Sequence, residues 1–465
     1  MHTTLSRLFA FITGIVILTV LNPVAGIDIL LVASAITVTA HVFLQEKLLF
    51  VFLIARPIFD YWRNYHILSF QNVDINLNAS LSMLFALWVA YMVIRHRKEM
   101  RNIPGMFWGA ATLCAMIVSA TYSISPFTTL VESMKFFATL GFFVISFVSI
   151  KKKKFTLHHL GYATLIMAII PLGAGLLQSI GSSGITTFDI SSRVFGSFAH
   201  PNIFAFFLLF LSIIFINYSA IQPLNFFKEQ AHKKYRYLGY VVLVTLIIQT
   251  YTRAAWIGLL AFLLIIGVLH FRKLFVSVLV TVIGFYAIFY PINTAIRSTT
   301  DYDLQDIQVI SRITSRNEDA DSLQWRKDLF LETMPIIRNN PFFGYGYGTF
   351  PQVWEKSRNI THLFDDSAEA HNDYLRLSLE IGFLGLGVYL IFLLSLLYQA
   401  IHTYWYRETH DKEMLFLIAW IAVFMLMSFS DNMLHHTPVM WLMWSWWGAL
   451  FANKWNKRKG VGFIE

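Results

Sequence analysis

Long apolar runs recur along the whole chain, and they restrict the fold more than any other feature of the sequence. Most runs approach the roughly 17–25 mostly apolar residues that an α-helix needs to cross a bilayer. Only 14% of the residues are charged, whereas soluble domains carry about 25%. Such a chain has too few charges to cover a water-facing surface. We therefore expect an all-α, polytopic membrane protein, with the bilayer as the solvent for much of the chain.

The apolar runs predict about 12–14 transmembrane helices, and an even number is expected. The candidate spans are residues 8–24, 28–44, 48–62, 79–94, 106–122, 136–150, 160–180, 202–218, 238–251, 254–269, 274–291, 374–398, 414–430 and 438–451. We expect one polytopic membrane domain over residues 1–465. Within it we expect N-terminal helices in residues 1–200, central helices in 201–291, a large helical extracytoplasmic loop in 292–373 and C-terminal helices in 374–465.

Lysine and arginine gather in alternate loops, for example at residues 95–101, 151–154 and 457–459. Cytoplasmic loops of membrane proteins carry such an excess, whereas long loops are translocated largely regardless of charge. This bias predicts a multi-pass protein of the cytoplasmic membrane, with both termini cytoplasmic and the loop at 292–373 outside. The net charge of +9 needs no nucleic-acid partner, because basic clusters of this kind face anionic membrane lipids.

Few residue patterns suggest a metal or a transport pathway. The single cysteine, Cys114, lies in an apolar run, which excludes a disulfide framework and a cysteine metal site; we expect it to pack in the core. Asp365 and Asp366 form an isolated acidic pair and support a metal site only weakly. Membrane-embedded charges are scarce, whereas ion-coupled carriers usually place several at mid-depth. This scarcity favours chemistry at the outer surface over transport.

Two polar turns face outward in this topology. The first runs from residue 192 to residue 202 and contains Arg193, His200 and Asn202, directly before a predicted span. It is either a capped helix entrance or a polar patch that faces an outer cavity. The second contains Thr252 and Arg253 between two apolar runs. Arg253 either snorkels to the interface or offers a bidentate guanidinium to a phosphate.

The long outer loop has an internal pattern of its own. Residues 324–338 place apolar side chains at helical spacing and predict an amphipathic helix, which includes Trp325 and Arg326. Pro341 and the glycines at 344, 346 and 348 predict a tight turn after it. These glycines do not form a dinucleotide fingerprint, because no strand–turn–helix unit surrounds them.

A third polar turn, His371-Asn372-Asp373, stands at the outer end of a predicted span. An unperturbed histidine titrates near pH 6.5, so His371 can accept a proton near neutrality. The alternative is an interfacial histidine that makes only a structural hydrogen bond.

Taken together, these turns resemble the O-antigen ligase and polymerase family of bacterial membrane glycosyltransferases. The similar blocks are Arg193–Gly196 with Pro201-Asn202, then Thr252-Arg253, then Arg326 with Pro341–Phe350, and finally His371–Leu375 with Glu380–Gly385. Two positions depart from the family pattern. Thr252 stands in place of serine and keeps the hydroxyl, and Phe330 stands in place of tryptophan.

The resemblance implies transfer of a glycan from undecaprenyl diphosphate to an acceptor hydroxyl on the outer face of the membrane. Ligases of the family use a lipid A core as acceptor, and polymerases use another lipid-linked repeat unit. We favour a polymerase of a cell-surface polysaccharide, because no feature speaks for a lipid A acceptor. The alternatives are an O-antigen ligase, a lipid-linked oligosaccharide flippase or transporter, and a scaffold protein. A flippase or a chain-length regulator is a candidate partner.

The resemblance and the chemistry of an activated donor suggest roles for individual residues. His371 is the candidate base, and Arg253 and Arg326 are candidate cations for the leaving diphosphate, as fixed positive charges stabilise developing negative charge. Single displacement would invert the anomeric centre, and no metal or cofactor is expected. The predicted substrate-binding residues are Arg193, His200, Asn202, Asn372, Asp373 and Trp325.

Overall fold

The computed structural model describes residues 44–60, 66–70, 73–181, 183–187, 190–220, 233–299, 322–357, 369–405 and 411–458, together with residues 37 and 41. The span predicted at 8–24 and nearly all of the span at 28–44 lie outside these residues. The chain divides into two compact units. The first contains Met1–Ile103, Met134–Ile169 and Trp441–Glu465, and the second contains Pro104–Ser133 and Ile170–Met440.

The described residues of the first unit are helical apart from one short hairpin. Its elements are η1 (Gln45–Lys47), α3 (Leu48–Asp60), β1 (His66–Phe70), β2 (Val73–Asn76), α4 (Leu77–Arg95), α5 (Arg97–Met100), most of α7 (Pro126–Lys151), the first half of α8 (Leu157–Gly181) and most of α20 (Thr437–Arg458). Strands β1 and β2 pair antiparallel. The core is rich in aromatic rings, and Trp441 packs on Phe142 with ring centroids 4.6 Å apart.

The second unit holds the remaining elements and all of the predicted site residues. They are α6 (Met106–Val118), η2 (Ser119–Thr121), β3 (Ile185–Thr187), β4 (Ile190–Arg193), α9 (Pro201–Ala220), α11 (Lys233–Gln249), α12 (Arg253–Leu269), α13 (Arg272–Thr299), α15 (Ser322–Asn339), α16 (Phe350–Ser357), α17 (Asp373–Glu380), α18 (Gly382–Trp405), α19 (Lys412–Met427) and η6 (Met433–His435). Strands β3 and β4 form an antiparallel pair.

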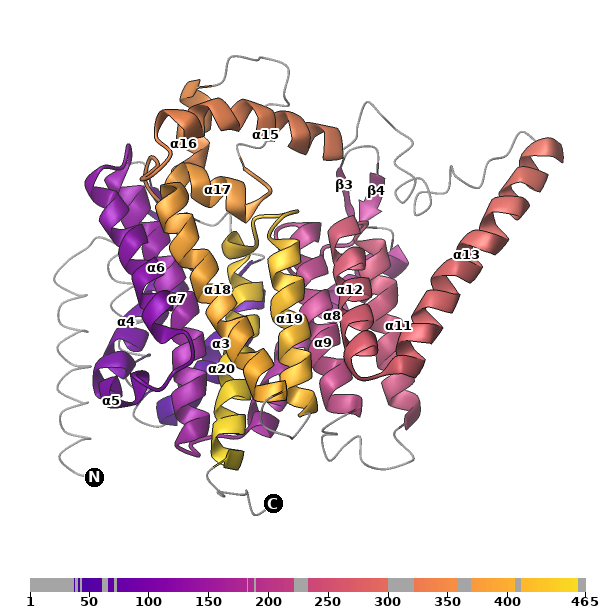
Figure 1. The fold of residues 1–465 in the computed structure, drawn as a ribbon, viewed down its shortest axis with the longest axis horizontal. Helices are drawn as coiled ribbons and strands as arrows, with labels where there is room; N and C mark the ends of the chain where they lie inside the picture. The colour runs from indigo at the N-terminus through magenta and orange to yellow at the C-terminus, as the bar shows by residue number, and fades with distance from the viewer. Residues whose placement is uncertain are drawn as a thin grey trace. The chain divides into compact units, whose positions relative to one another are not determined.

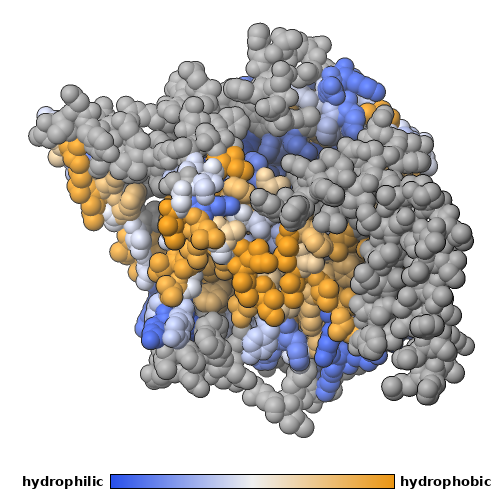
Figure 2. Space-filling model, turned by 180° about the vertical axis from the view of Figure 1, so that it is seen from behind, coloured by the Kyte–Doolittle hydropathy of each residue, from blue (hydrophilic) through white to orange (hydrophobic). Residues whose placement is uncertain are grey.

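The predicted class, an all-α polytopic membrane protein, is confirmed. Among the described residues, five helices are long and apolar enough to cross a membrane: Pro126–Lys151, Leu157–Gly181, Pro201–Tyr218, Arg272–Ile296 and Gly382–Trp405. Shorter apolar helices cover Leu81–Arg95, Met106–Thr121 and Arg253–Leu269. On the face drawn in Figure 2, hydrophobic residues gather in the middle and hydrophilic residues lie toward the ends. The count of about 12–14 spans stays a prediction.

Exposed apolar side chains lie where a lipid-facing helix would carry them. On α11, for example, Leu238, Val241 and Val244 are all exposed and are spaced three residues apart. Three or four residues make one helical turn, so these side chains share one face. The pattern is typical of a helix that is solvated by lipid on that face.

Within the second unit, the helices that bear the predicted site run side by side, and α15 lies across their ends (Figure 1). The turn before α9 contacts the end of α11, because Val194 N donates to Gln249 O at 3.2 Å. The start of α17 contacts the end of α19, because Asp373 N donates to Ser428 O at 2.8 Å. Turns far apart in the sequence therefore meet at one end of the unit.

The predicted amphipathic helix and glycine turn are both present. Helix α15 extends the predicted range by one or two residues at each end. Gly344, Gly346 and Gly348 all have positive φ angles, of 71°, 108° and 83°. A Cβ at Gly344 would meet the backbone of Leu379 and Glu380. The turn therefore packs its backbone directly against the C-terminal end of α17, which only glycine allows.

Two details differ from the sequence-based expectation. The span expected at 374–398 is two helices: the short α17 ends at Glu380, and the long apolar α18 begins at Gly382, whose φ is +66°. This left-handed residue breaks the helix at a position that the apolar pattern does not reveal. Cys114, expected in the core, is exposed on α6.

Candidate functional site

Arg193 is buried, with 4% of its surface exposed, and it joins three segments of the second unit. Its Nε donates to Thr250 O at 2.9 Å, and its Nη2 donates to Asn202 Oδ1 at 3.0 Å and Thr252 Oγ1 at 3.2 Å. A buried guanidinium requires several acceptors in fixed positions. Arg193 therefore fixes the entrances of α9 and α12 relative to each other.

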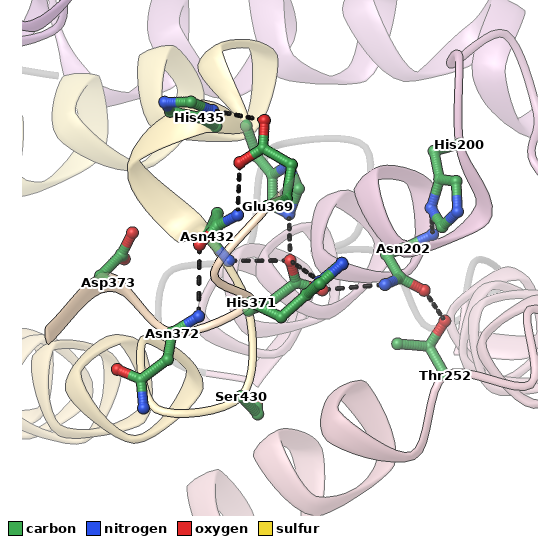
Figure 3. A network of polar contacts seen from close by, with 12 residues as sticks. His200, Asn202, Thr252, Glu369, His371, Asn372, Asp373, Ser430, Asn432 and His435 are labelled. Carbon is green, nitrogen blue, oxygen red and sulfur yellow. Dashed lines mark hydrogen bonds and ion pairs between the residues drawn. The ribbon is translucent and has the colours of Figure 1, made fainter. Parts of the chain in front are cut away.

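Asn202 extends this network across the end of the unit. Its Nδ2 donates to Asp431 Oδ2 at 2.9 Å, and its Oδ1 accepts from the hydroxyl of Thr252 at 3.2 Å (Figure 3). The described contacts of its side chain are with Arg193, Thr252 and Asp431. Asn202 thus connects the turn at Thr252 to the loop that follows α19.

Asp431 is the meeting point of two histidines. His371 Nδ1 lies 3.6 Å and His436 Nε2 3.2 Å from its Oδ1 (Figure 3 draws this cluster). Burial alone would raise the pKa of Asp431, but attraction to His436 and the contact with His371 hold it well below the usual range. Asp431 is therefore an ionised carboxylate that can orient His371 and stabilise its protonated form.

His371 itself has an unusual backbone. Its φ is +45°, a left-handed conformation that is uncommon outside glycine. It precedes Asn372, whose side-chain oxygen accepts from the N–H groups of Tyr374 and Leu375 and so caps α17. Backbone strain of this kind is found at functional sites, where surrounding structure holds it in place.

Asn372 and Asp373 also connect the loop before α17 to the loop after α19. Asn372 N donates to Asn432 Oδ1 at 3.2 Å, and the carboxylate of Asp373 accepts from Leu434 N at 3.3 Å. Asp373 is completely buried, and this burial raises its pKa to about 7. These contacts hold the turn at His371 in place; direct contact of either side chain with a sugar stays a prediction.

His200 lies beside the same network. Its Nδ1 accepts from Asn202 N at 3.1 Å. Desolvation by the protein, followed by the positive charge of Arg193, lowers the pKa of His200 to about 4. His200 is therefore neutral at physiological pH, so it can form hydrogen bonds with a substrate but adds no positive charge.

The remaining predicted residues lie on the helices that border the network. Arg253 is the first residue of α12, directly after Thr252, and is partly exposed. Arg326 is partly exposed on α15, and the side chain of Trp325 lies outside the described side chains. Their contact with a substrate stays a prediction.

Helix α15 packs firmly against its neighbours. An apolar cluster fixes it to α16 and α17; its members are Leu329, Ile336, Ile337, Phe350, Val353, Trp354, Ala370, Leu375 and Leu379. Tyr345 also donates its hydroxyl to Ile336 O at 3.1 Å. Since α17 begins two residues after His371, this packing holds α15, which bears Arg326, at a defined position relative to His371.

The sequence pattern did not predict most of the 431–436 segment, which supplies Asp431 and Asn432 to the network. The signal was available, because Ser430 to His436 places polar side chains between two apolar helices. Glu369 and Glu132 were also missed as site residues. Glu369 Oε1 lies 3.6 Å from His435 Nδ1, and Glu132 Oε2 lies 3.9 Å from His435 Nε2. Their positions in separate helices and loops give no local pattern.

Comparison with known proteins gives one family. Residues 238–390 match the family model described as O-antigen ligase. This segment contains Arg253, Arg326 and His371, and it confirms the resemblance that those motifs indicate. No curated protein matches the chain.

Proposed function

Since residues 238–390 belong to the O-antigen ligase family, we propose that this chain is a membrane glycosyltransferase that transfers a glycan from undecaprenyl diphosphate to an acceptor hydroxyl. The proposal rests above all on the His371–Asp431 pair, at 3.6 Å, beside the cationic turns of the second unit. A histidine oriented by a buried carboxylate is the arrangement that a general base requires.

The proposed reaction is a single displacement. The acceptor oxygen attacks the anomeric carbon while the bond between that carbon and the diphosphate oxygen breaks. Undecaprenyl diphosphate leaves with the bonding electron pair, and the acceptor proton passes to Nε2 of His371, because Nδ1 faces Asp431. Attack from the side opposite the leaving group inverts the anomeric configuration.

The charge on the leaving diphosphate needs stabilisation that the protein itself can provide. Arg253 begins α12, where helix N-terminal amides add partial positive charge. We assign Arg253 and Arg326 to the diphosphate, because a planar guanidinium binds phosphate oxygens in bidentate fashion. This arrangement needs no metal ion. Arg193 contributes by fixing Thr252 and, through it, the start of α12.

We favour polymerisation of repeat units over ligation to a lipid A core. The test supplies purified protein in nanodiscs with undecaprenyl-diphosphate-linked repeat units as the sole substrate, with EDTA present. Ladders of longer glycans that disappear in His371→Ala and Arg253→Lys are expected. Glu355→Gln, which removes an exposed carboxylate from α16, is the matched control and should leave the ladders unchanged.

Other outcomes would change the proposal in defined ways. Transfer only after a separate lipid A core is added would establish the ligase. A ladder that EDTA abolishes would contradict the metal-independent mechanism. Absence of undecaprenyl diphosphate release with any acceptor, together with movement of the lipid across the bilayer, would establish a flippase instead.

A further inference from the structure

A second group of ionisable side chains lies next to the base. His435, in η6, lies between two carboxylates: its Nδ1 is 3.6 Å from Glu369 Oε1, and its Nε2 is 3.9 Å from Glu132 Oε2. Asn432 donates from Nδ2 to Glu369 Oε2 at 2.8 Å (Figure 3). The proposed reaction gives none of these four side chains a task. We call Glu132, Glu369 and His435 the second carboxylate cluster.

The second carboxylate cluster is open to solvent on one side. The side chain of Glu369 is 40% exposed and that of His435 is 26% exposed, whereas that of Asp431 is only 3% exposed. A molecule in solution can therefore reach Glu369 and His435 directly. Asp431, in contrast, can act on a substrate only through the histidines beside it.

A buried cation lies close to this cluster. Arg376 is 1% exposed, and its Nε donates to Glu380 Oε1 at 2.8 Å. Among the described residues, its Nη1 and Nη2 have no hydrogen-bond partner, and its charge acts on Glu369. An unsatisfied buried guanidinium is expensive, so a site that holds one needs negative charge or a ligand nearby. Arg376 thus provides a fixed positive charge next to the two carboxylates.

Hydrogen bonds also link the second carboxylate cluster to the segment that bears His371. Asn432 connects Glu369 to the backbone N–H of Asn372, the residue that follows His371. Asn432 in turn follows Asp431, the partner of His371. Glu369 also lies only two residues before His371. A sugar that offers one hydroxyl to His371 would therefore present its other hydroxyls to Glu369.

The charge of the cluster selects between the two substrates of the proposed reaction. Burial would raise the pKa of Glu369, but His435 lowers it to about 2, so Glu369 is ionised. In direct contact, a carboxylate oxygen repels a phosphate oxygen but accepts a hydrogen bond from a neutral hydroxyl, so Glu369 and Glu132 favour a sugar over a diphosphate as their contact. Ionised carboxylates are strong acceptors for sugar hydroxyls.

We propose that Glu132, Glu369 and His435 form the subsite for the acceptor sugar, in which the two carboxylates accept hydrogen bonds from ring hydroxyls and thereby aim the attacking hydroxyl at His371. The subsite rests on the proposed function, because it assigns one of that reaction's two substrates. The donor diphosphate then lies on the other side of His371, toward Arg253.

The test measures glycan binding separately from turnover. The probe is the neutral oligosaccharide released by mild acid from lipid-linked repeat units, which lacks the diphosphate. Its binding to full-length protein in nanodiscs is followed by saturation-transfer NMR. Because one hydrogen bond to a charged group contributes about 1.5–3 kcal/mol, Glu369→Gln should weaken binding by about tenfold or more. Glu132→Gln should weaken it in the same direction.

Two control variants make the result specific. Glu355→Gln removes a charge from an exposed position on α16 and should bind the probe as wild type does. His371→Ala should bind the probe but transfer no glycan. Thermal unfolding of every variant verifies that the fold is intact.

Each further outcome has one meaning. Equal binding to wild type, Glu369→Gln and Glu132→Gln would overturn the subsite, as would no binding to the wild type. Binding that depends on Glu369 without any transfer by the wild type would instead overturn the glycosyltransferase and leave a glycan-binding site. Failure of the subsite and failure of the reaction are thus distinguishable.

Discussion

At the scale of single residues, Asp431 joins the parts of the candidate site. It contacts His371, His436 and Asn202 within 3.6 Å. An ionised carboxylate in this position stabilises a protonated imidazole. Arg193 has a different role: its hydrogen bonds to Thr250, Asn202 and Thr252 anchor the turns, whereas Asp431 acts on His371.

Replacing Asp431 with asparagine should slow glycan transfer by about 100-fold, since general base catalysis contributes about 10²–10⁴-fold. Because the pKa of Asp431 lies well below its usual range, the carboxylate does not itself titrate near neutrality. A neutral asparagine no longer stabilises the positive charge that His371 gains when it accepts the acceptor proton. Transfer rates of Asp431→Asn and wild type at neutral pH test this, and equal rates would contradict the pairing with His371.

Arg193→Ala should mainly reduce stability. The change removes three hydrogen bonds from a buried guanidinium, and bonds to charged groups contribute about 1.5–3 kcal/mol each to stability. We expect a clearly lower midpoint of thermal unfolding in detergent. Arg253→Ala, at a partly exposed position, is the comparison and should unfold near the wild-type temperature. Equal midpoints for Arg193→Ala and wild type would contradict the anchoring role.

At the scale of elements, the packing of α15 on α16 and α17 decides whether Arg326 has a fixed position. Leu329 is 1% exposed within the apolar cluster, whereas Leu331 on the same helix is 57% exposed. The amphipathic pattern of the sequence indicates one buried face. It does not indicate which helix covers that face.

Leu329→Ala should loosen α15, because removing a buried leucine costs about 2–5 kcal/mol. We expect faster hydrogen exchange in α15 and lower transfer activity. Leu331→Ala removes the same atoms from an exposed position and should change neither quantity by more than about twofold, as surface substitutions rarely change stability by more than about 0.5 kcal/mol. Equal exchange in the two variants would show that the apolar cluster does not hold α15.

At the scale of the molecule, the turns of the second unit alternate between two ends. Thr252 lies at the end that bears the candidate site, and α12 runs from there to the turn before Arg272. The bias of lysine and arginine along the sequence assigns the site end to the outside of the membrane.

The topology predicts which cysteines can be labelled from outside. With Cys114 replaced by alanine, Glu355→Cys on α16 should react with a membrane-impermeant maleimide in intact spheroplasts. Lys273→Cys, at the opposite end of α12 and α13, should react only after permeabilisation. Both positions are exposed, so access to the reagent is the variable that differs. The reverse pattern would place the candidate site in the cytoplasm.

The class of the protein follows from the sequence alone, and so does the choice of the first candidate site residues. Apolar runs of the length of a bilayer crossing leave few alternatives to membrane helices, because lipid offers no hydrogen bonds to other backbone conformations. Arg193, Asn202 and His371 stood out because polar residues between apolar runs are conspicuous. Helix α15 was predictable for a related reason, since its apolar period is local.

Only the tertiary structure decided which side chains meet. The contact between Asn202 and Asp431 joins residues 229 positions apart, and no local pattern encodes such a distance. The break between α17 and α18 depends on Gly382 and on the turn that packs beside it. A Cβ on Gly382 would meet the backbone of Phe342 and Phe343 in that turn. Packing then decided the charge states. Asp431 is ionised because two histidines lie beside it, and His200 is neutral because of desolvation and, after that, the charge of Arg193. Such environments arise only when separate segments pack together.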